Sequence, residues 1–139
     1  MTRNVARRQR SPGQALVEAA LILPALVLLV LGVFAAGVVG RTDAALLAVA
    51  QEAARAAATA SNPSDAAAHG LARGEQVAAG YRLNDANVAV DARDFRAGGL
   101  VRVDATATVS LIGLSVFGPM QVTLHHQQVE PVDPYRNLQ

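Results

Sequence analysis

An uncharged apolar run extends from Ala19 to Gly40. A run of this length crosses the hydrocarbon layer of a bilayer as a helix, because about 20 residues at 1.5 Å each are sufficient. Glu18 directly precedes the run, and the only charged residues before it are Arg3, Arg7, Arg8 and Arg10. The order of these parts predicts a basic leader over residues 1–13, a transmembrane helix over residues 14–40 and a domain outside the bilayer.

The charges on the two sides of the apolar run predict its orientation. Arginines that flank a membrane span stay on the cytoplasmic side, whereas Arg41 after the span is balanced by Asp43. We therefore expect a single pass through the cytoplasmic membrane, with the N-terminus inside and the C-terminal domain outside. A secretory signal cut near Ala35 or Ala36 is an alternative, although the apolar part of such signals usually spans about 7–15 residues.

Length and composition restrict the remainder of the chain. About 100 residues follow the predicted span, which is enough for one small domain. The chain has 12 basic residues, four of them in the leader, against 11 acidic residues. The domain is therefore weakly acidic, and this balance argues against a nucleic-acid partner. No cysteine is present, so disulfides and thiolate metal sites are excluded.

Two features break the uniformity of the predicted membrane helix. Pro24 removes one backbone donor and crowds the preceding turn, which predicts a bend. Gly32, Ala36 and Gly40 recur at every fourth position and form a small-residue stripe on one helix face. Such a stripe lets another helix approach closely, although composition alone also explains it in a chain rich in alanine and glycine.

Glu18 is the residue of the anchor that most needs a functional explanation. A carboxylate near the start of a membrane segment costs about 2–3 kcal/mol unless it is neutralised or reaches the interface. The N-terminus of the helix favours negative charge, so simple capping at the headgroup level is one interpretation. If the chain were cut after Gly13, a new amino group would appear on Gln14, four residues from Glu18, and could pair with it or with the same residue of a neighbour.

The stretch from Gly13 to Pro24, GQALVEAALILP, resembles the N-terminus of the TadE-like (TadE/TadG family) pseudopilins of the tight-adherence, or Flp-type, pilus system. The resemblance implies that a prepilin peptidase cuts between Gly13 and Gln14, and that Glu18 is the family's glutamate at the fifth mature position. Ala19 stands where the family commonly has Phe or Tyr.

A second segment, Ala50 to Ala57, resembles the family's Ala-x-Glu-x-Ala-Arg pattern after the span. No glycine or proline interrupts residues 41–60, so the helix is expected to continue beyond the membrane. Glu52 and Arg55 are three residues apart and are expected to pair on its wetter face. Its apolar stripe consists of Leu46, Ala50, Ala53 and Ala57.

Residues 61–139 are expected to form an extracytoplasmic domain. Pro63 predicts a break, after which a helix capped by Ser64 or Asp65 runs to about Gly80. Glycines at positions 70 and 74 are expected to interrupt or fray this helix.

Alternating patterns predict three strands after this helix. The first strand begins near Asn87, the second runs from Val101 to Leu111, and the third runs from Met120 to Val129. Turns are expected at 95–99 and 118–119. The tail from Glu130 to Gln139 is expected to be irregular. The fold class is α+β and pilin-like: a long membrane-spanning helix that continues into a domain of one further helix packed on a three-stranded antiparallel sheet.

Catalytic and metal-binding patterns give little support for an enzyme. His125 and His126 are adjacent on a predicted strand, so they point to opposite faces and cannot grip one metal together. Asp91, Asp94 and Asp104 could gather at one hairpin end, but a solvated edge is the preferred interpretation. We expect no metal and no cofactor.

The resemblance therefore implies a non-enzymatic, membrane-anchored minor pilin or pseudopilin, a substrate of a prepilin peptidase that contributes to a Flp-type pilus or a related secretion filament. Its implied partners are the membrane, the prepilin peptidase and other pilin or pseudopilin subunits, in a homo- or hetero-oligomer. The alternative is an uncleaved single-pass anchor that carries a binding or sensor module at the cell surface.

Overall fold

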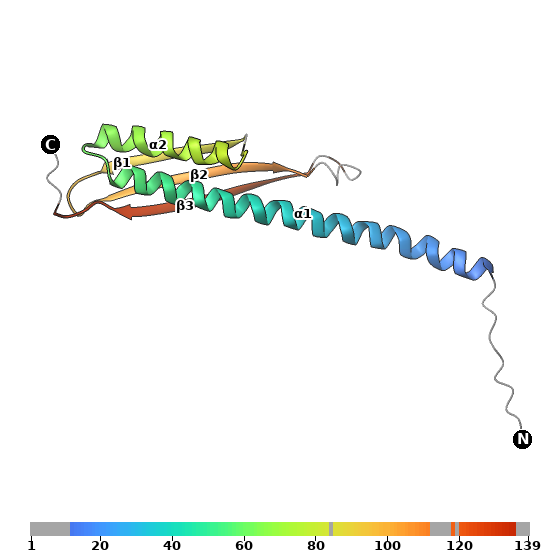
Figure 1. The fold of residues 1–139 in the computed structure, drawn as a ribbon. Helices are drawn as coiled ribbons and strands as arrows, with labels where there is room; N and C mark the ends of the chain where they lie inside the picture. The colour runs from blue at the N-terminus through green and yellow to red at the C-terminus, as the bar shows by residue number, and fades with distance from the viewer. Residues whose placement is uncertain (1–11, 84, 112–117, 119, 136–139) are drawn as a thin grey trace, which may run out of the picture.

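The computed structural model describes residues 12–83, 85–111, 118 and 120–135. Its elements in chain order are α1 (Pro12–Ala58), α2 (Pro63–Gly80), β1 (Ala86–Asp94), β2 (Leu100–Ser110) and β3 (Gln121–Pro131). The strands form one antiparallel sheet in the order β1-β2-β3. Figure 1 shows α2 and the C-terminal part of α1 lying along the sheet, while the N-terminal part of α1 projects far beyond it. The predicted α+β class, with one long helix, one further helix and three strands, is confirmed.

The helix α1 has 47 residues, which corresponds to a length of about 70 Å. It runs without interruption across Pro24, so the proline is accommodated inside the helix, and the predicted bend stays a prediction. The first buried residue of α1 is Ala45. The helix therefore continues past the predicted span, and only its last part packs against the domain.

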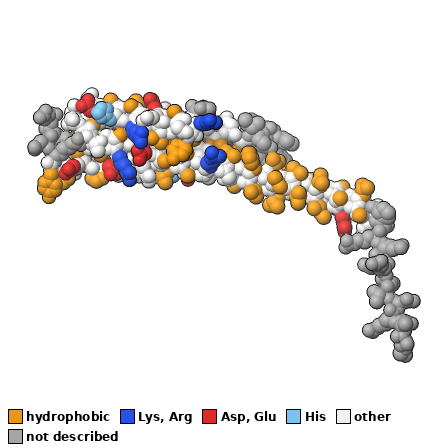
Figure 2. Space-filling model, viewed as in Figure 1, with side chains coloured by type: hydrophobic (Ala, Val, Ile, Leu, Met, Phe, Trp, Pro, Cys, Tyr) orange, Lys and Arg blue, Asp and Glu red, His pale blue; other side chains and the backbone are white. Residues whose placement is uncertain are grey.

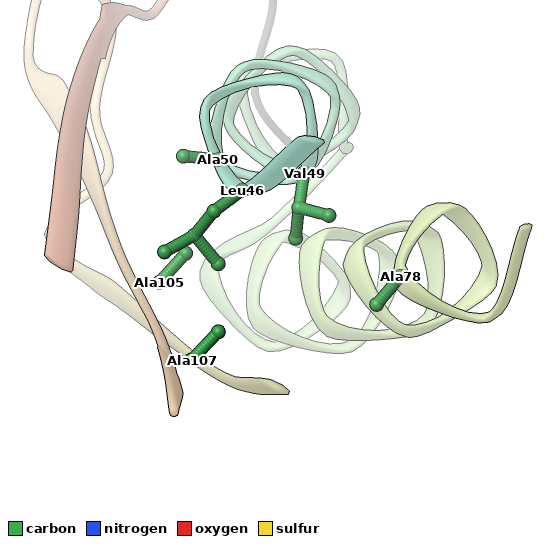
Figure 3. Packing of buried hydrophobic residues seen from close by; sticks show 6 residues of the cluster. All are labelled: Leu46, Val49, Ala50, Ala78, Ala105 and Ala107. Carbon is green, nitrogen blue, oxygen red and sulfur yellow. The ribbon is translucent and has the colours of Figure 1, made fainter. Parts of the chain in front are cut away.

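The C-terminal part of α1 forms the centre of the core. All four residues of the predicted apolar stripe are fully buried: Leu46, Ala50, Ala53 and Ala57. Figure 3 shows Leu46 directed toward Ala105 and Ala107 of the sheet, and Val49 on the side of α2. Burying a leucine or valine side chain stabilises a fold by about 1.5–3 kcal/mol. The many alanines contribute less each, but they allow the layers to approach closely.

The helix α2 is continuous, which corrects the expectation that its glycines would fray it. Gly70 and Gly74 are both buried. A Cβ atom on Gly70 would lie 3.0 Å from the Cβ of Ala57 and 3.1 Å from the carbonyl oxygen of Ala53, and one on Gly74 would lie 2.9 Å from a methyl of Val88. The glycines therefore lie where α2 passes closest to α1 and β1, and packing outweighs their low helix propensity.

The cap of α2 also differs from the expectation, because Asn62 and not Ser64 or Asp65 occupies the N-cap position. The backbone N–H of Asp65 donates to Oδ1 of Asn62 at 2.9 Å, and Nδ2 of Asn62 donates to the Asp65 carboxylate at 2.8 Å. Pro63 fills the first helical position, where no backbone donor is needed, so the capping side chain must come before it.

The strand β2 buries its alternate residues Val101, Val103, Ala105, Ala107 and Val109, as the alternating pattern predicts. It ends at Ser110, one residue before the predicted end at Leu111, which is half-buried. The third strand is longer than expected and ends at Pro131.

The tail is ordered where it follows this strand. Val132 is fully buried, its N–H donates to the Gly99 carbonyl at 2.9 Å, and its carbonyl accepts from Gly98 at 3.2 Å. Gly98 has a φ of +72°, as the predicted turn requires. The prediction of an irregular tail is therefore wrong for Glu130 and Pro131, which extend β3 and pair with Val101 and Leu100 of β2. Val132 lies outside the strand, and the turn between β1 and β2 supplies its backbone partners. Residue 119 of the predicted turn at 118–119 and residues 136–139 of the tail lie outside the described residues.

Candidate membrane and assembly site

The free part of α1 exposes a continuous apolar surface. Its large apolar side chains between Leu16 and Phe34 are 47–73% exposed, except for the half-buried Leu31. Figure 2 shows them as an orange band along the projecting helix. By length and composition this helix can cross a membrane, and its most apolar window buries nothing within the chain. Water solvates such a surface poorly, so lipid or other helices must cover it.

The predicted cleavage residues lie in the first turn of α1. Both Gly13 and Gln14 are exposed, and the position of a Cβ atom on Gly13 is open space. The first N–H groups of a helix have no partner inside the helix. Opening this turn to an extended conformation therefore breaks few hydrogen bonds. Residues 1–11 of the predicted basic leader lie outside the described residues.

Glu18 lies one turn further along the helix and is exposed. Residues four apart share a helix face, so its carboxylate is on the side of Gln14, with about 6 Å of helix rise between them. Within the described part of the chain, Glu18 forms no ion pair. Its position therefore allows a partner from outside the fold.

The small-residue stripe lies on the uncovered part of α1. Gly32, Ala36 and Gly40 are all exposed, and a Cβ atom on either glycine would meet nothing within 4 Å. The described residues thus leave this face free, and whether another helix uses it stays a prediction.

The charged residues of the domain form pairs that do not converge on one site. His126 Nε2 lies 2.8 Å from Oδ1 of Asp43 on α1, whereas His125 Nε2 lies 3.3 Å from Oδ1 of Asp104 on β2. The two histidines therefore engage different partners, as their opposite faces require. Among the described residues, no group of three His, Cys, Asp or Glu side chains could hold a metal.

The three aspartates of the predicted cluster have different partners: arginines for Asp91 and Asp94, and His125 for Asp104. Asp91 pairs with Arg93 at 2.6 Å, and Asp94 pairs with Arg96 at 2.9 Å. The hydrogen bond from the Arg93 side chain holds the pKa of Asp91 well below its usual range. These pairs are exposed, and they fit a solvated hairpin edge.

Two contacts were beyond sequence reasoning. Glu52 is 3.9 Å from Arg55, the predicted partner, but only 2.9 Å from Arg73 of α2. His126 and Asp43 join β3 to α1 across 83 residues of sequence. No local pattern marks either pair, because each depends on how distant elements meet.

Residues 13–55 match the sequence model of the TadE-like protein family. The match confirms the TadE-like resemblance of the anchor. It includes the whole first segment, Gly13 to Pro24, and the second segment from Ala50 as far as Arg55. No curated protein and no solved structure matches the chain significantly.

Proposed function

We propose that this chain, TadE-like over its anchor, is a non-enzymatic minor pilin or pseudopilin that contributes to a Flp-type pilus or a related secretion filament. The observation that carries the proposal is the extent of the family match. It begins at Gly13, the residue before the predicted cut, includes the whole apolar run, and ends at Arg55 in the part of α1 that packs against the domain. The matched segment is therefore the one that would be processed, anchored and assembled.

In this proposal a prepilin peptidase cuts between Gly13 and Gln14. The exposure of both residues and the weakly bonded first turn of α1 support access to this peptide bond. The cut removes the basic leader and leaves an ammonium group on Gln14. Glu18, one turn away on the same helix face, is then placed to bind that group or the equivalent group of a neighbouring subunit.

Before assembly, the apolar part of α1 holds the protein in the cytoplasmic membrane, with its N-terminus inside and the domain outside. On assembly, helices of other pilin or pseudopilin subunits replace lipid around the exposed side chains. The stripe of Gly32, Ala36 and Gly40 would let one such helix approach closely. The exposed apolar band and the ion-pair partner missing from Glu18 support this assembly role.

The mass of the mature protein from its native host tests the proposal. We expect a chain that begins at Gln14, and we expect Gly13→Leu to block the cut and leave the full-length protein. Gly37→Leu is the matched control, because it adds the same side chain to an open position of the same helix. A parent that begins at Met1 or Thr2 would support the uncleaved binding or sensor module, and one that begins near Ala36 would support a cleaved secretory signal.

Topology has a separate test. A reporter that is active only outside the cytoplasm, fused after Gln139, should be active, and protease added to spheroplasts should digest the domain beyond Gly40. Protection of the domain would invert the proposed orientation.

A further inference from the structure

A pocket of about 390 Å³ lies between α1 and the C-terminal end of α2, where α1 leaves the predicted span. Its lining includes apolar and aromatic side chains and two arginines: Val38, Arg41, Ala45, Tyr81, Arg82 and Leu83. We propose that this pocket binds the phosphate headgroup of an anionic phospholipid from the leaflet next to the domain. The inference goes beyond the pseudopilin proposal and rests only on residues 14–40 lying in the membrane.

The position of the pocket along α1 fits the headgroup layer. Arg41 directly follows the last residue of the predicted span, and Ala45 is the first buried residue of the helix. From Val38 to Ala45 the helix rises about 10 Å. The polar layers on the two sides of a bilayer together add about 10–15 Å to its hydrocarbon core, so the pocket spans the level at which lipid phosphates lie.

The charges of the pocket suit an anion. Arg41 and Arg82 are both exposed, and neither forms an ion pair with any residue that the structure describes. Asp43, the carboxylate nearest to Arg41 in sequence, is instead bound to His126 at 2.8 Å. Asp85 lines a neighbouring pocket together with Arg82 without forming an ion pair with it. Guanidinium groups bind phosphate through parallel hydrogen bonds, which a lone lysine cannot reproduce.

Tyr81 adds an aromatic contact to the two charges. Its side chain is 57% exposed at the end of α2 that faces the predicted membrane. Tyrosine is enriched at the headgroup level, because the ring enters the apolar edge of the bilayer while the hydroxyl stays wet. The pocket therefore presents an apolar wall and an aromatic ring beside its two cations, as a lipid headgroup with attached chains requires and a free phosphate does not.

The backbone at Arg82 gives independent support. Arg82 has a φ of +58°, and it follows the C-cap residue Tyr81. Its N–H donates to the Ala79 carbonyl at 3.0 Å, and the N–H of Leu83 donates to the Ala78 carbonyl at 2.9 Å. This is the Schellman arrangement, in which glycine is the residue usually found at this position. An arginine here is strained in its backbone, so the reason for its presence is to be sought in its side chain.

Native mass spectrometry of the full chain, purified in detergent with a defined lipid mixture, tests the proposal. The probes are phosphatidylglycerol and phosphatidylcholine at equal amounts, and the readout is the number of each lipid that the protein retains. We expect a preference for phosphatidylglycerol that falls about fivefold for each arginine removed, in Arg41→Gln, Arg82→Gln and the double variant. Arg102→Gln is the matched control, because it removes an exposed arginine of β2 that likewise forms no described ion pair.

A second variant separates lipid binding from folding. Arg82→Gly relieves the backbone strain, so the melting temperature of the domain should stay equal or rise while retention of phosphatidylglycerol falls. Unchanged lipid retention in Arg82→Gly and in the double variant would overturn the proposal, as would equal retention of the two lipids by the parent. Inorganic phosphate that displaces the lipid would assign the pocket to a free anion and would also overturn it. The same spectra report the N-terminus, so failed processing and failed lipid binding are distinguishable.

Discussion

The two parts of α1 are both apolar, yet they differ in the size of their side chains. Between Leu16 and Phe34 the large side chains of the helix are leucine, isoleucine, valine and phenylalanine, and all except Leu31 are exposed. Between Ala45 and Ala58 its buried residues are alanines, apart from Leu46 and Val49. Lipid chains are fluid and adapt to large side chains, whereas α2 and the sheet are fixed surfaces that must come close. Both parts of α1 are therefore apolar enough to leave water. The volume of the side chains differs, because large ones suit a fluid lipid environment and small ones suit close packing in the domain.

The two glutamates of α1 extend this comparison to charge. Glu52 lies in the part that packs on the domain and has Arg73 at 2.9 Å. Glu18 lies in the exposed part and forms no ion pair within the described residues. The ion pair of Glu52 joins two helices of the domain, whereas the carboxylate of Glu18 is available to a group from another chain.

The largest expected effect is on assembly, in Glu18→Gln. The variant keeps size and hydrogen bonding but removes the charge that would pair with a terminal ammonium. Losing one partner of a desolvated pair costs about 3–5 kcal/mol. Co-purification with the proposed pilin or pseudopilin partners should therefore fall by more than about 100-fold, while membrane insertion survives. The matched variant Glu52→Gln removes an exposed pair worth less than about 1 kcal/mol and should assemble as the parent does.

Cleavage must be followed in the same cells, because a protein that keeps its leader would also fail to assemble. A Glu18→Gln protein that is cut normally and assembles like the parent would leave Glu18 as an interfacial acid only.

The second effect is on the stability of the domain, in Ala53→Leu. Ala53 is fully buried beside Gly70 and Gly74, so the added carbons have no space. Overpacking of this kind costs about 3 kcal/mol. Ala36→Leu makes the same change at an exposed position of the anchor and should leave the domain unaffected. Hydrogen exchange of the β2 amides, with the full chain in detergent micelles, measures both. Equal protection in the two variants would refute the role assigned to side-chain volume.

A smaller effect is expected from Gly70→Ala. Alanine gains about 1 kcal/mol of helix propensity over glycine, but the new Cβ lies 3.0–3.1 Å from Ala57 and the Ala53 carbonyl. We expect a net destabilisation of about 1–2 kcal/mol, because neither neighbour can move freely. Gly80→Ala, in open space at the end of the same helix, should be neutral or stabilising. A stabilised Gly70→Ala would show that the packing of α2 is looser than these distances indicate.

The smallest effect is a gain, in Arg82→Gly. Glycine adopts the left-handed conformation of residue 82 without the penalty of about 1–2 kcal/mol that a side chain carries there. The greater freedom of glycine in the unfolded chain offsets about 0.4–1 kcal/mol of this gain. Thermal unfolding of the domain should therefore shift upward by an amount equivalent to about 0.5–1 kcal/mol. A loss of stability would mean that the Arg82 side chain makes a stabilising contact within the domain.

Local patterns were sufficient for much of this protein. The uncharged run predicted a helix that is long and apolar enough to cross a membrane, and alternation predicted the buried residues of β2. A single element determines each of these features. The Gly98 turn belongs to the same class, since its backbone conformation is a property of a few consecutive residues. The pairing of Gly13, Gln14 and Glu18 into a candidate site needed only helix periodicity and the family resemblance.

Other features became visible only in the tertiary structure. Gly70 and Gly74 look like helix breakers in sequence, and only the approach of α1 and β1 shows why they are small. The ordered start of the tail at Val132 depends on backbone groups of a distant turn. The pocket between Arg41 and Arg82 exists because α2 returns to the point where α1 leaves the predicted span. The sequence by itself determined what each segment is, since hydropathy and periodicity act over neighbouring residues, whereas the fold decided which segments meet, since close packing depends on shape at both surfaces.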